Sequence, residues 1–288
     1  MKKYLKEMRV SHWLKNGILF LPAFFGGNIF NPETLIQLML GFCAFSFMSS
    51  AIYIINDIND IEKDKLHPEK RKRPIAAGLI SVRKAVIMAV FLAVLAVCCV
   101  ALAVIYGSSI FSFVVLIAYL FINLLYSVWG FKNKVLIDVI MLASGFVLRA
   151  YMGSVITGVN MSSWLYLVVV LGSFYLGFGK RRNELLSSGE KTRKVLKKYT
   201  PSYLGNMMNI CMGMALVFFS LWCKEKDDMA GGNKFVLLVP FMIIICFRYN
   251  YLLECADSSG DPMEVILKDK FILILAAIMG CACVFMIY

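Results

Sequence analysis

Long apolar stretches, each about the length needed to cross a lipid bilayer, make up most of this chain. A transmembrane helix needs roughly 20 mainly apolar residues to cross a hydrocarbon layer about 30 Å thick. The sequence therefore predicts an all-α fold, a polytopic membrane helix bundle of about nine transmembrane helices in a single domain over residues 1–288. The predicted spans are about 13–27, 34–56, 83–106, 110–129, 135–158, 162–179, 201–222, 235–255 and 270–287.

The composition excludes several other classes of protein. Apolar residues make up 60% of the chain and charged residues only 17%, whereas soluble domains have about 45–50% and about 25%. A soluble enzyme, a secreted disulfide scaffold and a disordered chain therefore fit poorly. The nine cysteines lie mostly inside apolar stretches without a CxxC pair, so we interpret them as small packing residues.

Basic residues are distributed unequally between the two sides of the predicted bundle. With the N-terminus in the cytoplasm, 25 of the 30 Lys and Arg residues fall in cytoplasmic segments and three in outer segments. This asymmetry follows the positive-inside rule. The net charge of +12 therefore indicates membrane orientation and not nucleic-acid binding. We expect a multi-pass protein of the cell membrane with a cytoplasmic N-terminus.

Two predicted cytoplasmic loops, 57–82 and 180–200, hold most of the loop length and charge. If the second span continues as a helix into the first loop, Asp57, Asp60 and Asp64 share one helix face. Carboxylates stacked in this way repel one another unless a cation lies among them. Mg²⁺ is suited to such a position, because it binds through one or two carboxylates together with substrate phosphates. The alternative is a solvated acidic helix end.

A basic run, Lys-Arg-Lys-Arg at residues 70–73, follows this acidic face. The positive-inside rule explains a basic run but not the acids beside it. Mg²⁺ with adjacent Lys and Arg residues neutralises the charge of a diphosphate. The pattern therefore favours diphosphate binding at the cytoplasmic face, between loops 57–82 and 180–200.

The motif from Asn56 to Asp64, between the second and third predicted spans, resembles the first aspartate-rich motif of the UbiA-type prenyltransferase superfamily. The resemblance covers essentially the whole chain. It departs after the sixth span, where residues 179–184 read Gly-Lys-Arg-Arg-Asn-Glu in place of a second aspartate-rich motif. In this respect the chain is similar to the decaprenyl-phosphate phosphoribosyltransferase branch. Other similar segments are Trp13-Leu14-Lys15-Asn16, Arg73-Pro74-Ile75-Ala76-Ala77-Gly78, Tyr126-Ser127, Lys132-Asn133, residues 136–150 and Arg248-Tyr249.

The resemblance implies a reaction in membrane-linked cell-envelope biosynthesis. Phosphoribosyl diphosphate (PRPP) and a polyprenyl (decaprenyl-type) phosphate would give polyprenylphosphoryl-5-phosphoribose and diphosphate, with Mg²⁺ as cofactor. The leaving diphosphate gains charge in the transition state, so preorganised cations lower the barrier. The resemblance also allows a homo-oligomer such as a trimer.

On this interpretation Asp57, Asp60 and Asp64 are catalytic metal ligands, and Asn56 supports them. The expected substrate-binding residues are mostly cations and lie mostly near the predicted cytoplasmic ends of the spans. They are Lys15, Asn16, Arg71, Arg73, Tyr126, Lys132, Arg149, Lys180, Arg181, Glu184 and Arg248.

Two of these arginines, Arg149 and Arg248, lie within predicted spans, where a charged group normally faces the bundle interior or a water-filled cavity. Asp138 is eleven residues before Arg149, close to three helical turns, so an interior ion-pair network is an alternative to substrate binding. In the loop after the eighth span we expect the carboxylates of residues 257, 261, 264 and 269 to be solvated.

Two alternative functions remain open. A UbiA-type prenyltransferase would move a polyprenyl group from its diphosphate to a small acceptor, but it would need a second carboxylate cluster, which residues 180–184 do not supply. An anion transporter would also use intramembrane arginines. Transporter sites, however, lie near the bilayer midplane on broken helices, whereas these charges lie at the predicted inner boundary.

Overall fold

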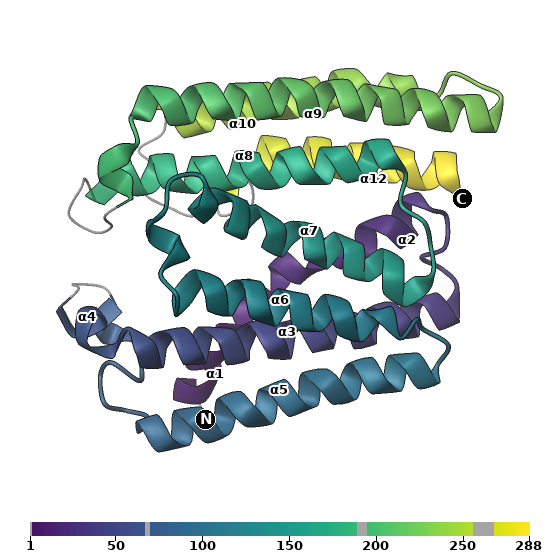
Figure 1. Ribbon diagram of the computed structural model, residues 1–288. Coiled ribbons are helices and arrows are strands. Elements are labelled where there is room, and N and C mark those ends of the chain that lie inside the picture. Colours follow the sequence, from purple (N-terminus) through teal and green to yellow (C-terminus); the bar gives the residue numbers. More distant parts are fainter. Residues whose placement is uncertain (1, 67–69, 189–194, 256–267) are drawn as a thin grey trace. The chain divides into compact units, whose positions relative to one another are not determined.

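The computed structural model describes residues 2–66, 70–188, 195–255 and 268–288. These residues form helices joined by turns, without a strand (Figure 1), and the predicted all-α fold is confirmed. The chain divides into two compact units. Unit 1 is Met1–Phe131 with Leu148–Asn160, and unit 2 is Lys132–Val147 with Met161–Tyr288.

Within the described part of the chain, seven helices are long and apolar enough to cross a membrane. The prediction of a multi-pass membrane protein is therefore confirmed. An eighth apolar helix, α6 (Phe111–Ser127), has 17 residues and a length of about 25 Å. The seven are α3 (Pro32–Asn59), α5 (Val82–Ile105), α7 (Ile137–Thr157), α8 (Ser163–Ser188), α9 (Pro201–Ala230), α10 (Leu238–Cys255) and α12 (Lys270–Ile287).

The predicted first span, 13–27, is not one long helix. After α1 (Lys2–Met8), the chain forms the 3₁₀ helix η1 (Val10–Phe20) and the short α2 (Leu21–Phe25), with Pro22 in the first turn of α2. Because a 3₁₀ helix rises about 2.0 Å per residue and an α-helix 1.5 Å, the two segments together rise about 30 Å. The count of nine transmembrane helices and the cytoplasmic N-terminus stay predictions.

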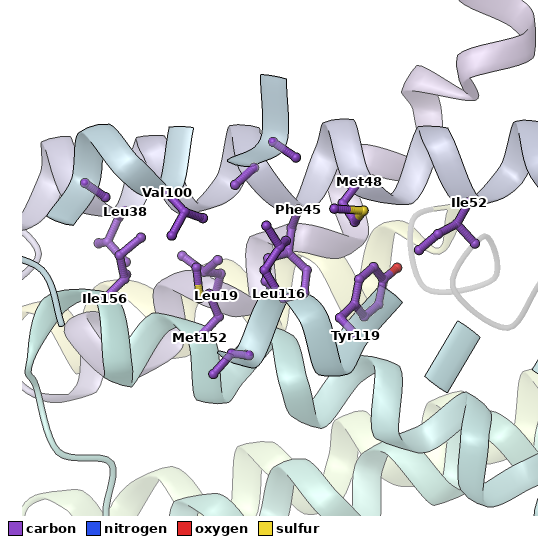
Figure 2. Packing of buried hydrophobic residues seen from close by; sticks show 14 of the residues in the cluster. Leu19, Leu38, Phe45, Met48, Ile52, Val100, Leu116, Tyr119, Met152 and Ile156 are labelled. Atoms are coloured by element: carbon purple, nitrogen blue, oxygen red, sulfur yellow. The ribbon is translucent and has the colours of Figure 1, made fainter. Parts of the chain in front are cut away.

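In unit 1, α3 packs along α5, and η1 and α6 also contact α3. The core of this unit is built from apolar side chains of all four elements and of the C-terminal half of α7 (Figure 2). Burial of such side chains stabilises each by roughly 1.5–3 kcal/mol. Figure 2 labels Leu19, Leu38, Phe45, Met48, Ile52, Val100, Leu116, Tyr119, Met152 and Ile156.

In unit 2, α8 packs along α9, and α10 contacts both α9 and α12. Helix α9 begins at Pro201, where the sixth-to-seventh span boundary was expected. The Thr200 side chain accepts a hydrogen bond from the Tyr203 N–H at 3.1 Å, and Pro201 occupies the first turn of α9. Both features stabilise a helix N-terminus. The threonine side chain pairs with a backbone N–H that has no partner within the helix, and proline has no N–H to pair.

Candidate functional site

Asp57, near the C-terminal end of α3, is the centre of a buried charged cluster in unit 1. Arg9 donates through Nη2 to both carboxylate oxygens of Asp57, each at 2.6 Å. Arg73 donates through Nη1 to Asp57 Oδ1 at 2.9 Å. The Asp57 side chain is only 4% exposed. Two guanidinium groups therefore compensate a carboxylate that burial alone would disfavour.

Arg73 also joins Asp57 to Asp64, because the same Nη1 atom lies 2.6 Å from Asp64 Oδ2. Helix α3 ends at Asn59 with Asp60 as its C-cap residue, and α4 (Ile61–Leu66) follows. The hydrogen bonds from the Asp60 and Asp64 N–H groups to the carbonyls four residues earlier are kept, at 3.0 and 2.8 Å. Asp57 and Asp64 thus meet at Arg73, although α3 ends between them. Asp60 itself is half-buried and accepts a hydrogen bond from Lys63 at 3.0 Å.

Arg9 was not predicted as a site residue. It lies between α1 and η1 with φ 51° and ψ 50°, the left-handed region, which costs a residue with a side chain roughly 1–2 kcal/mol. The hydrogen bonds to Asp57 and a stack of the guanidinium over the Tyr53 ring, 4.6 Å from the ring centroid, offset this cost. Sequence pattern could not indicate this pairing, because Arg9 and Asp57 are 48 positions apart.

Glu7 is a second residue that sequence reasoning missed. It is 1% exposed, and it lies close to Asp57 and to the backbone of Ile75. Burial, together with the negative charge of Asp57, raises the pKa of Glu7 to about 7. The cluster therefore includes a carboxyl group that holds its proton in mildly acidic conditions.

The carboxylate oxygens of Asp57 accept hydrogen bonds from Arg9 and Arg73, so a magnesium ion here would bind together with substrate and share these oxygens with the two arginines. Asn56 Oδ1 is buried without a hydrogen-bond partner among the described residues, so it is a free oxygen donor beside Asp57. No group of three or more His, Cys, Asp or Glu side chains in the described segments is arranged to hold a metal. Because Mg²⁺ commonly uses one or two carboxylates plus phosphate oxygens, this donor set suits a metal–diphosphate complex.

Arg149, in the C-terminal half of α7, lies in a second polar cluster of unit 1. It donates through Nε to Asn16 Oδ1 at 2.6 Å and through Nη2 to the Tyr119 hydroxyl at 2.8 Å. Asn16 in turn donates to Ser46 Oγ at 2.9 Å. Arg149 is 7% exposed and Asn16 is fully buried. Two predicted substrate-binding residues, Asn16 and Arg149, are thus in direct contact.

Asp138 forms an ion pair with Arg181. Arg181 donates through Nε to Asp138 Oδ2 at 2.5 Å and through Nη1 to Glu184 at 2.6 Å. The interior ion-pair network expected around Asp138 therefore includes Arg181. Arg181 is fully buried, and loss of one partner of a buried pair costs about 3–5 kcal/mol. This geometry favours a positioning role for Arg181, although it was predicted as a phosphate ligand.

Arg248 is also paired with a carboxylate. It donates to Asp269 Oδ2 at 2.9 Å, while Asp269 Oδ1 accepts the Ile272 N–H at the start of α12. The hydrogen bond from Arg248 and the backbone N–H of Ile272 lower the pKa of Asp269. The prediction that Asp269 is solvated is therefore wrong, because its side chain is only 12% exposed. Residues 257, 261 and 264 lie outside the described residues.

The remaining predicted substrate-binding residues are partly accessible. Their side chains can therefore meet a ligand without unfolding of a helix. Lys15, Tyr126, Lys132, Lys180 and Glu184 are half-buried, and Arg71 is exposed.

The fold and these clusters define a polytopic helical membrane protein with an arginine-bound acidic motif. The profile of the UbiA prenyltransferase family matches residues 18–247. The chain belongs to this family.

Curated relatives and solved structures agree with this assignment. The decaprenyl-phosphate phosphoribosyltransferase of Corynebacterium glutamicum is 36% identical over 94% of this chain and 82% of its own length. The protein of the same name from Mycobacterium tuberculosis is 32% identical over 94% and 90%. A UbiA homologue from Archaeoglobus fulgidus, solved bound to GPP and Mg²⁺, shares the fold with a TM-score of 0.74 and 20% identity, over 99% of both chains.

Proposed function

We propose that this protein transfers the 5-phosphoribosyl group of PRPP to a polyprenyl phosphate of the decaprenyl type. The products would be polyprenylphosphoryl-5-phosphoribose and diphosphate. The observation that carries the proposal is similarity across 94% of the chain to relatives that bear this enzyme's name. The protein is thus a pentosyltransferase on the scaffold of a prenyltransferase family.

The residues around Asp57 suit the departure of a diphosphate. Bound Mg²⁺ would neutralise part of the charge that the leaving group gains, and Asn56, Asp57, Asp60 and Asp64 are the residues that would hold it. Arg9 and Arg73 both donate hydrogen bonds to Asp57 and fix the direction of its oxygens. Such preorganised charge stabilises a transition state without reorganisation cost.

The acceptor needs little activation by the protein. A lipid phosphate is already ionised at neutral pH, so its main requirement is positioning by cations. Lys132 and Lys180, both half-buried, are the residues that we assign to this task. The next residue of α8, Arg181, holds this part of the helix in place, because it donates hydrogen bonds to Asp138 and Glu184.

We also propose that the protein acts in the cell membrane as one UbiA-like domain over residues 1–288. On this proposal the N-terminus and both charged loops, 57–82 and 180–200, face the cytoplasm, and the active site lies at that face. This orientation follows from the distribution of basic residues. A homo-oligomer such as a trimer stays a prediction.

A paired assay tests the proposed function. Membranes that contain the protein are supplied with labelled PRPP and a polyprenyl phosphate, with Mg²⁺ or with a chelator. We expect a lipid-linked phosphoribose only with Mg²⁺. Asp57→Asn should abolish it, because the substitution removes the charge that Arg9 and Arg73 orient.

Asp228→Asn is the matched control, because Asp228 is an exposed partner of Lys224 in α9. This variant should keep wild-type activity. Transfer of a labelled prenyl group to a small aromatic acceptor, without phosphoribosyl transfer, would instead support the prenyltransferase alternative.

A further inference from the structure

A continuous line of hydrogen bonds in unit 2 connects a buried ion pair to the backbone of Leu136. Arg181 donates to Asp138 Oδ2 at 2.5 Å, and the Tyr199 hydroxyl donates to Asp138 Oδ1 at 2.7 Å. The N–H of Leu136 donates to the same hydroxyl at 2.8 Å. The direction of each bond is fixed, because a carboxylate only accepts and a backbone N–H only donates.

Leu136 is held in a conformation that its side chain disfavours. Its φ is 65°, in the left-handed region that residues other than Gly, Asn and Asp seldom adopt. Its carbonyl accepts the Ile140 N–H at 2.8 Å, so the chain enters α7 directly from this strained residue. Its own N–H has no partner within α7 and donates instead to the Tyr199 hydroxyl.

The environment keeps this arrangement intact at neutral pH. Asp138 and Arg181 are each fully buried, so each compensates the charge of the other. Burial raises the pKa of the Tyr199 hydroxyl, so the hydroxyl remains protonated and continues to donate to Asp138. Strain that persists in a folded protein requires such surrounding contacts.

The segment just before Leu136 contains a residue that we expect to bind a phosphate. Lys132 lies in η3 (Phe131–Asn133), four residues before Leu136. The φ and ψ of Leu136 set the direction in which residues 132–135 leave the start of α7. A relaxed Leu136 would therefore move Lys132.

We propose that Tyr199, supported by Asp138 and Arg181, holds residues 132–136 in place and thereby positions Lys132 for a substrate phosphate. In this role the three are positioning residues, which act through Lys132. The proposal rests on the proposed phosphoribosyl transfer for its effect on catalysis. The restraint on Leu136 can be measured without that activity.

Tyr199→Phe tests the effect on catalysis, because it removes only the hydroxyl. We expect KM for PRPP or for the polyprenyl phosphate to rise about tenfold, as for one net hydrogen bond, while kcat changes much less. Tyr203→Phe is the matched control, since its ring stacks on that of Tyr199, with centroids 6.1 Å apart, but is exposed. Unchanged KM values in Tyr199→Phe would overturn the proposal.

A rescue separates positioning from a general loss of stability. In the Tyr199→Phe background, Leu136→Gly should bring the raised KM most of the way back to the wild-type value, because glycine adopts positive φ without strain. A defect of Tyr199→Phe that lies elsewhere in the fold would not be repaired by a change at Leu136. Failure of this rescue would therefore count against the proposal.

Hydrogen–deuterium exchange provides the readout that is independent of activity. In wild-type protein the Leu136 amide should exchange more slowly than that of the neighbouring exposed Asn133, and Tyr199→Phe should abolish the difference. Equal exchange in wild type would overturn the proposal even if no variant accumulates in membranes. If wild type shows protection but no phosphoribosyl transfer, the proposed function fails while the restraint on Leu136 stands.

Discussion

Arg9 donates to both carboxylate oxygens of Asp57, at 2.6 Å each. The two residues come from opposite ends of the N-terminal region, one before the first apolar stretch and one after the second. The contact makes a basic residue of the N-terminal segment part of the aspartate-rich motif. The motif is therefore completed by the fold of unit 1 and not by its own loop alone.

Loss of Arg9 should impair catalysis. Arg9→Met leaves Asp57 with Arg73 as its remaining arginine partner, and a charge-assisted hydrogen bond is worth about 1.5–3 kcal/mol. We expect kcat/KM for phosphoribosyl transfer to fall roughly 10- to 100-fold, and Arg9→Lys to give an intermediate loss. Arg83→Met removes an exposed charge at the start of α5 and should be neutral. Equal activities in Arg9→Met and Arg83→Met would contradict the prediction.

Gly153 should tolerate no side chain. A Cβ at this position would lie 1.9 Å from the Leu19 carbonyl oxygen, so η1 and α7 would have to separate. We expect Gly153→Ala to destabilise the protein by about 3 kcal/mol or more in thermal unfolding in detergent. Gly213→Ala is the control, because a Cβ there has no neighbour within 4 Å. If both variants unfold at the wild-type temperature, the close packing of η1 on α7 is wrong.

Glu7 should make stability depend on pH. Its pKa is about 7 in the folded protein, above the ordinary 4.5, so between these values the folded state binds more protons than the unfolded state. Stability should therefore fall as pH rises through this window. Glu7→Gln mimics the protonated form and should be more stable than wild type at pH 8, by about 2 kcal/mol, with little difference below pH 5. Parallel pH profiles of the unfolding temperature would refute this.

Substitution of Arg149 should show whether this residue has a structural or a substrate-binding role. Arg149→Lys keeps the charge but loses the rigid fork that reaches both Asn16 and Tyr119, so we expect a stability loss of about 2 kcal/mol. If Arg149 also contacts substrate, activity per folded molecule should fall as well. Tyr119→Phe is the comparison, since it removes the hydroxyl that Arg149 contacts and leaves the charge. Full activity per folded molecule in Arg149→Lys would exclude substrate binding.

Much of the fold could be predicted from local pattern. Apolar length and the scarcity of charge indicate membrane helices, because lipid offers the backbone no hydrogen-bond partners. The break expected between the spans 83–106 and 110–129 and the span expected to begin at about residue 201 are both observed. The first span was predicted as one helix, and periodicity could not indicate that it divides into η1 and α2.

The partners of charged side chains were not predictable in the same way. The acidic motif indicates that Asp57 needs a cation, but not that Arg9 supplies one from 48 positions away. Spacing placed Asp138 on the face of Arg149, yet Asp138 binds Arg181 of another helix.

The amino-acid sequence by itself thus determined the helical membrane class, the acidic and basic motifs and the family resemblance, since these depend on composition and on neighbours along the chain. Only the tertiary structure decided which arginine meets which carboxylate, that Glu7 is buried, and that Leu136 is strained. These features depend on contacts between segments far apart in sequence, where burial removes water and makes each pairing energetically decisive.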